Sequence, residues 1–378
     1  MYTDDVRFCA KDGTKLLTGS TATPTPATPP LGVPPVRPNS PVPPAAAVAT
    51  TAPTAPAAPS AATPASTGPK TVDFAKLSGQ LLDNRYQVAR KIGEGGMSFV
   101  YLAQDSNTGE KVAIKILSPA LIKDQNAMAR LRREAALGGR LAHPNVCHII
   151  RLGETAAGLV YIVMPFIQGE LLCDRTVRFA HLPLDVTAGF VRDMSGGLQV
   201  AHDLGIIHRD LKPENIMIVT RPDGTERAVV MDFGLAKERQ VSPEVQKLTA
   251  TGIVLGTPEF MSPEQLRGKV LDPRTDIYSL AIMTFEMLTG KLPFEGRTQQ
   301  EIMIARLKGD PMPIRTARPE LDLPVGVERV LAKAMARDRE QRYLTTLEFG
   351  EAFSKAAGGE DPTGGDGGGG VFGRLLRR

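Results

Sequence analysis

Hydrophobic and polar positions follow two different rhythms along this chain. Short apolar runs, broken by turn residues such as Asn107-Thr108-Gly109, occupy the stretch from residue 86 to residue 164, and runs of this kind are typical of strands. Beyond Gly169 the apolar positions recur at helical spacing. The predicted strands are 86–92, 99–104, 111–117, 146–152 and 159–164, and the predicted helices are 127–142, 185–203, 275–288, 298–308 and 325–337. The pattern predicts an α+β chain in which a sheet-rich part with one helix precedes a mainly helical part.

The two ends of the chain follow neither rhythm. Residues 20–70 hold 15 of the 31 prolines, mixed with Ala and Thr. A segment of this composition buries no core, so we predict a disordered, extended linker there. Ordered structure is expected over residues 80–355, and the Gly-rich residues 356–378 are interpreted as a flexible tail.

The first 19 residues form a short polar segment around Cys9 that resembles half of a zinc ribbon. Zinc takes about four protein ligands in structural sites, and no second cysteine lies near Cys9. A simple tail, or a remnant of such a ribbon, is therefore the favoured interpretation of residues 1–19.

Composition narrows the possible classes of function. The net charge of +4 is too small to indicate binding to nucleic acid or to an anionic membrane. The three cysteines are widely spaced, which favours a reducing compartment over a disulfide framework. No apolar run reaches the length of about 18 residues that a membrane span needs. We therefore expect a cytoplasmic protein without a transmembrane segment or a nucleic-acid partner.

The densest cluster of reactive side chains is His208-Arg209-Asp210-Leu211-Lys212-Pro213-Glu214-Asn215. Seventeen residues after Asn215 comes Asp232-Phe233-Gly234, directly after the apolar run 228–231. This order of a polar loop, a hairpin and a second carboxylate resembles the catalytic loop and metal-binding motif of protein kinases. The resemblance covers about residues 86–350 and is strongest to bacterial Ser/Thr protein kinases of the Hanks type, whose bilobal fold it implies.

The resemblance implies a role for each polar residue of the loop. Asp210 would accept the proton of the substrate hydroxyl, and Lys212 would neutralise charge on the transferred phosphate. Asn215 and Asp232 would offer oxygen ligands to Mg²⁺, with Mn²⁺ as an alternative ion. Lys115, in the apolar strand Val112-Ala113-Ile114-Lys115, would contact the phosphates of ATP and pair with Glu134 on the predicted helix 127–142.

A glycine-rich turn between the first two strands would let backbone N–H groups approach the phosphates of ATP. The segment 161–170 resembles the hinge between the two lobes, where Met164 would be the gatekeeper, Pro165 and Ile167 would offer backbone groups to adenine, and Glu170 would reach the ribose. The predicted ATP-binding residues are Ile92, Gly93, Glu94, Gly95, Gly96, Met97, Ser98, Val100, Ala113, Lys115, Met164, Pro165, Ile167 and Glu170.

The stretch from Asp232 to Glu264 resembles an activation loop. Kinases with an arginine before the catalytic aspartate, here Arg209, are often switched by a phosphate on this loop. Thr249 and Thr251 are the candidate autophosphorylation sites, and a transient dimer is a natural partner arrangement for that reaction. The resemblance also implies that Thr257 contacts the residue after the phosphorylated hydroxyl.

Two further carboxylates are expected to serve the scaffold. Glu264, in Ser262-Pro263-Glu264, should form a buried ion pair with Arg342, and Asp276 should cap the backbone of the catalytic loop.

Three positions depart from the family pattern. Ser98 stands where glycine is usual, Pro165 where glutamate is common, and Gly138 where an apolar packing residue normally follows the paired glutamate by four. With Gly139 beside it, Gly138 costs the predicted helix about 2 kcal/mol relative to two alanines. We therefore hypothesise that this helix is incompletely packed.

The sequence thus predicts a serine/threonine protein kinase that transfers the γ-phosphate of ATP to protein substrates, with activation-loop autophosphorylation. A pseudokinase scaffold is the first alternative, and the intact Lys115, Asp210, Asn215 and Asp232 argue against it. A small-molecule phosphotransferase of similar fold is the second, and the long threonine-bearing loop argues against that one.

Overall fold

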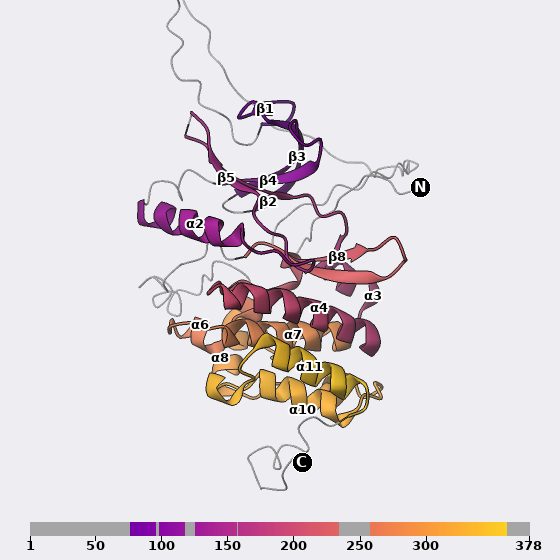
Figure 1. The fold of residues 1–378 in the computed structure, drawn as a ribbon. Helices are drawn as coiled ribbons and strands as arrows, with labels where there is room; N and C mark the ends of the chain where they lie inside the picture. The colour runs from indigo at the N-terminus through magenta and orange to yellow at the C-terminus, as the bar shows by residue number, and fades with distance from the viewer. Residues whose placement is uncertain (1–75, 96–97, 118–124, 157, 234–257, 361–378) are drawn as a thin grey trace, which may run out of the picture. The chain divides into compact units, whose positions relative to one another are not determined.

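The structure is a computed structural model that describes residues 76–95, 98–117, 125–156, 158–233 and 258–360. Within these residues the chain forms a sheet-rich lobe followed by a helical lobe (Figure 1). No helix in the described ranges is long and apolar enough to cross a membrane.

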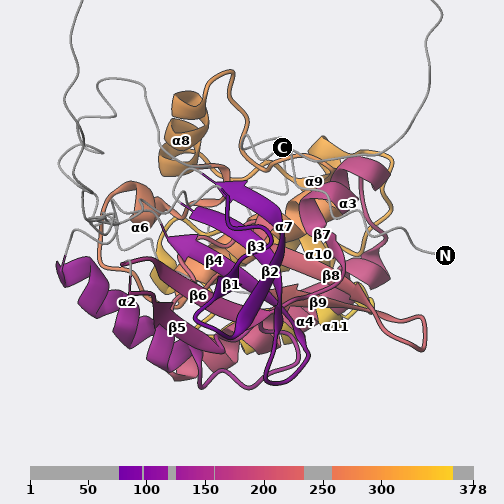
Figure 2. The ribbon, with the colours of Figure 1, turned by 90° about the horizontal axis from the view of Figure 1, so that it is seen from above.

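The first lobe is built on one antiparallel sheet in the order β1-β2-β3-β4-β6-β5. Its strands are β1 (Leu81–Leu82), β2 (Tyr86–Gly95), β3 (Ser98–Asp105), β4 (Lys111–Leu117), β5 (Arg151–Glu154) and β6 (Val160–Pro165). Helix α2 (Gln125–Gly138) runs along one side of this sheet (Figure 2). Its Met128, Leu131 and Ala135 pack with Ile149 and Ile162 in a small apolar cluster, which holds α2 against the sheet.

A second sheet, with three antiparallel strands, begins directly after the first lobe and is completed by two strands that follow α4. It consists of β7 (Glu170–Leu171), β8 (Ile216–Thr220) and β9 (Glu226–Val230). In the hairpin β8–β9 the first residue of β8, Ile216, lies opposite the last residue of β9, Val230. The residues just before β8 and just after β9 are therefore brought together.

The helical lobe is organised around α7 (Arg274–Thr289), in which every residue from 275 to 289 except Glu286 is buried. A helix buried on all sides lies inside a core rather than on its surface. The other helices are α3 (Leu172–Phe179), α4 (Leu184–Asp203), α6 (Pro263–Leu266), α8 (Gln299–Lys308), α9 (Ile314–Ala317), α10 (Val325–Ala334) and α11 (Thr346–Ala357), with short 3-10 turns at Pro213–Asn215, Pro258–Phe260 and Arg339–Gln341.

The predicted fold class and the main elements are confirmed, and several boundaries are wrong. Helix α2 ends at Gly138 rather than at residue 142, so Gly139 lies beyond it. The strand predicted over 146–152 begins only at Arg151, and Val146 instead forms an isolated bridge with Val230. The short elements β1, α3 and β7 and the last helix, α11, were not predicted.

Candidate active site

The catalytic loop runs from His208 to the 3-10 turn at Asn215, between α4 and β8. Asp276, fully buried on α7, accepts hydrogen bonds from the backbone N–H groups of His208 (2.8 Å) and Arg209 (3.0 Å). Arg209 has φ +65°, a left-handed conformation that costs a non-glycine residue energy unless its surroundings hold it. The predicted cap by Asp276 is confirmed, and it fixes this strained turn.

Two side chains that the sequence reasoning missed support the same turn. His202 of α4 places Nε2 2.7 Å from Asp276 Oδ2. Burial alone would raise the pKa of the Asp276 carboxyl, but this hydrogen bond and the neighbouring histidines hold it below its ordinary value. Gln265 of α6 donates from Nε2 to the carbonyl of Arg209 at 2.7 Å. Ser262 and Gln265 form a capping box, and its Ser-x-x-Gln spacing is the one signal that would have drawn attention to Gln265.

Asp210 and Asn215, five residues apart, meet at the centre of the loop. Asn215 donates from Nδ2 to the carbonyl of Asp210 at 2.7 Å, and the same nitrogen lies 3.4 Å from Asp210 Oδ2. The backbone continues this closure, because Met231 N–H donates to the Asn215 carbonyl at 2.8 Å. The loop is therefore tied directly to the segment that carries Asp232.

Asp232 lies just beyond β9 with φ +54°, and its Oδ2 is 2.9 Å from Nζ of Lys115 on β4. Although burial would raise the pKa of this carboxyl, the charge and hydrogen bond of Lys115, together with His208 and Lys212, hold the pKa below its ordinary value. Lys115 of the first lobe and Asp232 thus form an ion pair that joins the two lobes.

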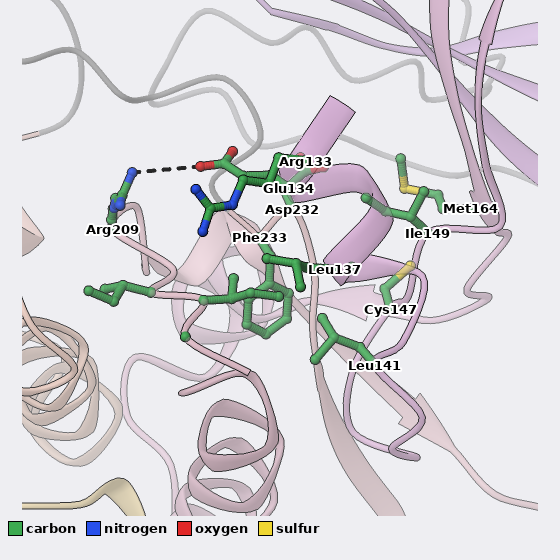
Figure 3. A pocket seen from close by; sticks show the side chains of 14 residues that line it. Arg133, Glu134, Leu137, Leu141, Cys147, Ile149, Met164, Arg209, Asp232 and Phe233 are labelled. Carbon is green, nitrogen blue, oxygen red and sulfur yellow. Dashed lines mark ion pairs between the residues drawn. The ribbon is translucent and has the colours of Figure 1, made fainter. Parts of the chain in front are cut away.

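Glu134 of α2 has a different partner from the one predicted. Its Oε1 lies 3.8 Å from Nη1 of Arg209 (Figure 3), whereas Lys115 is paired with Asp232. No ion pair between Lys115 and Glu134 occurs among the residues that the structure describes. The expected lysine–glutamate pair is therefore replaced here by two pairs, each of which joins one lobe to the other.

A cavity of about 270 Å³ lies between α2, the catalytic loop and Asp232 (Figure 3). Leu137, Leu141, Ile149 and Phe233 are among its apolar lining residues, and Gly138 also lines it. A Cβ atom on Gly138 would lie 2.8 Å from Cδ1 of Ile149, so Ile149 fills the space nearest the glycine. The hypothesis of an incompletely packed helix agrees with this cavity, although Ile149 compensates in part.

The predicted ATP-binding residues of the first lobe lie on four neighbouring strands. β2 carries Ile92, Gly93, Glu94 and Gly95, β3 carries Ser98 and Val100, β4 carries Ala113 and Lys115, and β6 carries Met164 and Pro165. Val100 lies opposite Lys115, and Ala113 lies opposite Met164. Gly96 and Met97 lie outside the described residues.

The hinge contains two interactions that the sequence did not suggest. Glu170, predicted to reach a ribose, accepts hydrogen bonds from Arg175 Nε (3.0 Å) and Arg178 Nη2 (2.8 Å). Glu170 therefore has cationic partners of its own within the chain. The second interaction involves buried Cys147, whose thiol lies 3.8 Å from the carbonyl of Pro165, and burial raises the pKa of that thiol to about 12.

Beyond the activation loop, the predicted scaffold pair is confirmed. Arg342 donates from Nη1 and Nη2 to the two carboxylate oxygens of Glu264 at 2.7 and 2.8 Å, and both side chains are buried. Thr275 adds a hydrogen bond of 2.9 Å to the same carboxylate. The candidate phosphorylation sites Thr249 and Thr251, and Thr257, lie outside the described residues.

A small antiparallel sheet with one helix, a helical lobe and a polar loop closed onto a second carboxylate together define a protein kinase domain. The chain belongs to this family, because the protein kinase domain family matches residues 86–346. Within it, similar curated proteins include bacterial serine/threonine-protein kinases. The chain is 34% identical over 280 residues to pkn3 of Myxococcus xanthus and 37% identical over 284 residues to PknB of Mycobacterium leprae.

These matches cover 74% of this chain in both cases, but 51% of pkn3 and 44% of PknB, so the chain spans about half the length of the curated relatives. Among solved structures, the kinase domain of Mycobacterium tuberculosis PknI is similar, with a TM-score of 0.58 and 27% identity over 74% of this chain and 99% of that one. The family and the bilobal fold are thereby established.

Proposed function

We propose that this chain is an ATP-dependent serine/threonine protein kinase. The observation that carries the proposal is the meeting of three elements at one place: Lys115 from the sheet reaches Asp232, while Asn215 closes the loop onto Asp210. Phosphoryl transfer needs this combination of a phosphate-binding cation, oxygen ligands for a metal and a carboxylate that positions the hydroxyl. The relatives named as serine/threonine-protein kinases support the same residue preference.

In this proposal the residues of the loop divide the chemistry. Asp210 accepts the proton of the attacking serine or threonine hydroxyl and orients its oxygen toward the γ-phosphate. Lys212, two residues further on, balances the charge that spreads over the phosphate oxygens during transfer. A positioned general base of this kind contributes roughly 10²–10⁴-fold to the rate.

A divalent cation fits the donor set of the site. The Asn215 amide nitrogen donates to the Asp210 carbonyl, so Asn215 could offer its amide oxygen, and Asp232 its carboxylate, as ligands to a divalent cation. Carboxylate and amide oxygens are ligands that Mg²⁺ and Mn²⁺ prefer. When bound, such an ion neutralises phosphate charge. Lys115 would then have to release Asp232.

The adenine end of ATP is assigned to the hinge. Backbone groups of Pro165 and Ile167 would bind adenine, Met164 would line the inner wall, and the glycine turn of β2 and β3 would cover the phosphates. Glu170 would have to share its carboxylate between Arg175, Arg178 and a ribose hydroxyl. Its contribution to ATP affinity should therefore be smaller than that of a carboxylate without arginine partners.

Exchange of ion partners provides a route to activation. Phosphate on Thr249 or Thr251 would attract Arg209, since a phosphothreonine carries about −1.5 to −2 charge. Glu134 would then lose Arg209 and pair with Lys115, and Asp232 would become available to the metal. A transient dimer, in which one copy phosphorylates the loop of another, would supply that phosphate.

The remaining assignments concern the parts around the kinase domain. We propose residues 20–70 as a spacer between the segment 1–19 and the domain 80–355. The predicted tail 356–378 begins too early, because Ala356 and Ala357 belong to α11 and Ala356 is buried. Residues 1–75 and 361–378 lie outside the described residues. Cys147 and Cys173 are buried and form no disulfide bond among the described residues, which supports the proposal of a reducing, cytoplasmic setting.

The test is to incubate the full chain with γ-labelled ATP and Mg²⁺, with and without a basic protein such as histone. Label on serine or threonine, lost with a chelator and in Asp210→Asn, is the expected result. Phosphopeptide mapping then reads out Thr249 and Thr251. Absence of label on both the chain and histone would instead favour a scaffold that binds without transfer.

A further inference from the structure

Four consecutive backbone carbonyls, those of residues 258–261, each accept a hydrogen bond from a buried side chain. Arg306 of α8 donates from Nη1 to the carbonyls of Pro258 and Met261 (3.0 Å to Met261) and from Nη2 to that of Glu259. Ser279 of α7 donates from Oγ to the carbonyl of Phe260 at 2.7 Å. This short segment is therefore fixed in space by side chains from two helices.

Arg306 is a charged residue in a buried position. It is 1% exposed, although α8 is otherwise a surface helix with no other buried residue. The guanidinium lies over the ring of Phe294, 5.4 Å from its centroid, and its hydrogen-bond acceptors are backbone carbonyls. Burying a charge is costly unless its donors are satisfied, and Arg306 Nε has no hydrogen-bond partner in the described part of the chain. Burying Arg306 therefore carries an energetic cost that a leucine at this position would not have.

The segment that Arg306 holds faces the catalytic loop. Phe260, Met261, Gln265 and Ser279 line a small cleft together with Arg209–Lys212. Gln265, four residues after Met261, binds the carbonyl of Arg209. A shift of residues 258–261 would therefore alter the wall that stands beside Asp210.

We propose that Arg306 is a positioning residue for the protein substrate: by clamping the carbonyls of residues 258–261 it sets the place of the acceptor hydroxyl relative to Asp210. The inference rests on the proposed kinase function. The hydrogen bonds of Arg306 within the described residues all go to the carbonyls of residues 258–261, and none goes to Lys115 or Asp232, so its effect is directed at the acceptor and not at ATP.

The test compares three variants of the full chain with the parent. Arg306→Met removes all the donors, and Arg306→Lys keeps the charge but replaces the planar fork by a single point of donation. Arg267→Met is the matched control. Exposed Arg267, just after α6, also donates to a backbone carbonyl, that of Leu307 on α8 at 3.1 Å, but its hydrogen bond does not involve residues 258–261.

Steady-state rates with histone and γ-labelled ATP give the separate KM values, and thermal denaturation reports folding. For Arg306→Met we expect the KM for histone to rise about tenfold or more, or kcat/KM for histone to fall by that factor, since small misplacements near a reaction centre cost up to ~10². The KM for ATP should stay within about twofold, Arg306→Lys should fall between, and Arg267→Met should match the parent.

Two results would overturn the inference while leaving the kinase proposal intact. In the first, the histone and ATP parameters of an active Arg306→Met chain equal those of the parent. In the second, Arg306→Met and Arg306→Lys lose ATP binding and stability together, which would make Arg306 a residue of folding only. A parent chain that labels neither histone nor itself would refute the kinase proposal directly, and the inference with it.

Discussion

Replacing Glu264 of α6 by glutamine removes the negative charge from its buried ion pair with Arg342. In the parent chain both Arg342 donors reach the Glu264 carboxylate, and the side chains of Arg342 and Glu264 are 0% and 5% exposed. Arg342 has further acceptors in the carbonyls of Arg274 (3.0 Å) and Ala336 (2.8 Å). It will therefore stay in place after the substitution and remain charged, without a counter-ion and with only one of its two side-chain acceptor oxygens left.

The size of the effect follows from this burial. Breaking a buried pair by removing one partner costs about 3–5 kcal/mol, because an uncompensated charge remains. Glutamine still offers one oxygen to Arg342, so we expect the lower end, a loss of about 3 kcal/mol in the free energy of unfolding. For a domain of this size the midpoint of thermal unfolding should fall by roughly 6–12 °C.

The pH dependence gives a second, independent reading. Burial would raise the pKa of Glu264, but the hydrogen bond and charge of Arg342 outweigh it and hold the pKa below its ordinary value. A lowered pKa means that the carboxylate stabilises the fold fully above the unfolded value of about 4.3 and loses this effect as the pH falls through the folded pKa. The gap in stability between the parent and Glu264→Gln should be constant from pH 8 to about pH 5 and shrink below about pH 4.3.

Chemical and thermal denaturation followed by circular dichroism measure both quantities. Glu340→Gln is the matched control, since Glu340 lies 2.7 Å from Arg274 but its side chain is 64% exposed, and exposed pairs contribute little. The reasoning is refuted if the two glutamine variants have the same midpoint at pH 7, or if the Glu264→Gln gap does not change with pH.

Three further outcomes are expected. Asp210→Asn should lower turnover by ~10²–10⁴ with little change in the KM for ATP, and near-normal initial rates would contradict its role as base. Thr249→Ala with Thr251→Ala should lower the activity of protein isolated after autophosphorylation, and equal activity would argue against a loop switch. Gly138→Leu should destabilise the domain by about 1–3 kcal/mol in urea titrations, because its Cβ would press on Ile149; unchanged stability would mean that the cavity absorbs the side chain.

The parts of the site that the sequence predicted well are those whose residues lie close together in the chain. His208–Asn215 and Asp232 are joined by a single hairpin, so their spacing alone brings them together. Asp276 and the Glu264–Arg342 pair were also predicted, because each occupies a recognisable position in the family pattern. Helix boundaries were less certain, and α2 ended earlier than its apolar period because Gly138 and Gly139 weaken its last turn.

Long-range choices between partners could not be read from the sequence. Arg306 and the carbonyl of Pro258 are 48 residues apart, and a buried arginine that binds carbonyls leaves no charge pattern to detect. Likewise the sequence places Glu134 on a helix near the site, but whether it meets Lys115 or Arg209 depends on the position of α2 against the sheet. That position is set by packing around Ile149, which no local motif encodes.

The four charges that join the lobes explain why the position of α2 matters. Lys115 with Asp232 and Arg209 with Glu134 form two ion pairs, so these four charges balance one another. Pairing Lys115 with Glu134 instead leaves Asp232 and Arg209 each without its partner from the other lobe. On the proposed function, a metal carrying ATP supplies the cation for Asp232 and a loop phosphate supplies the anion for Arg209. Each of these ligands would stabilise the rearranged pairing only in part, because each would replace only one of the two ion pairs that the rearrangement breaks. On the proposed function, coupling between nucleotide binding and loop phosphorylation would follow from this charge balance, and α2 would be the element that shifts between the two pairings.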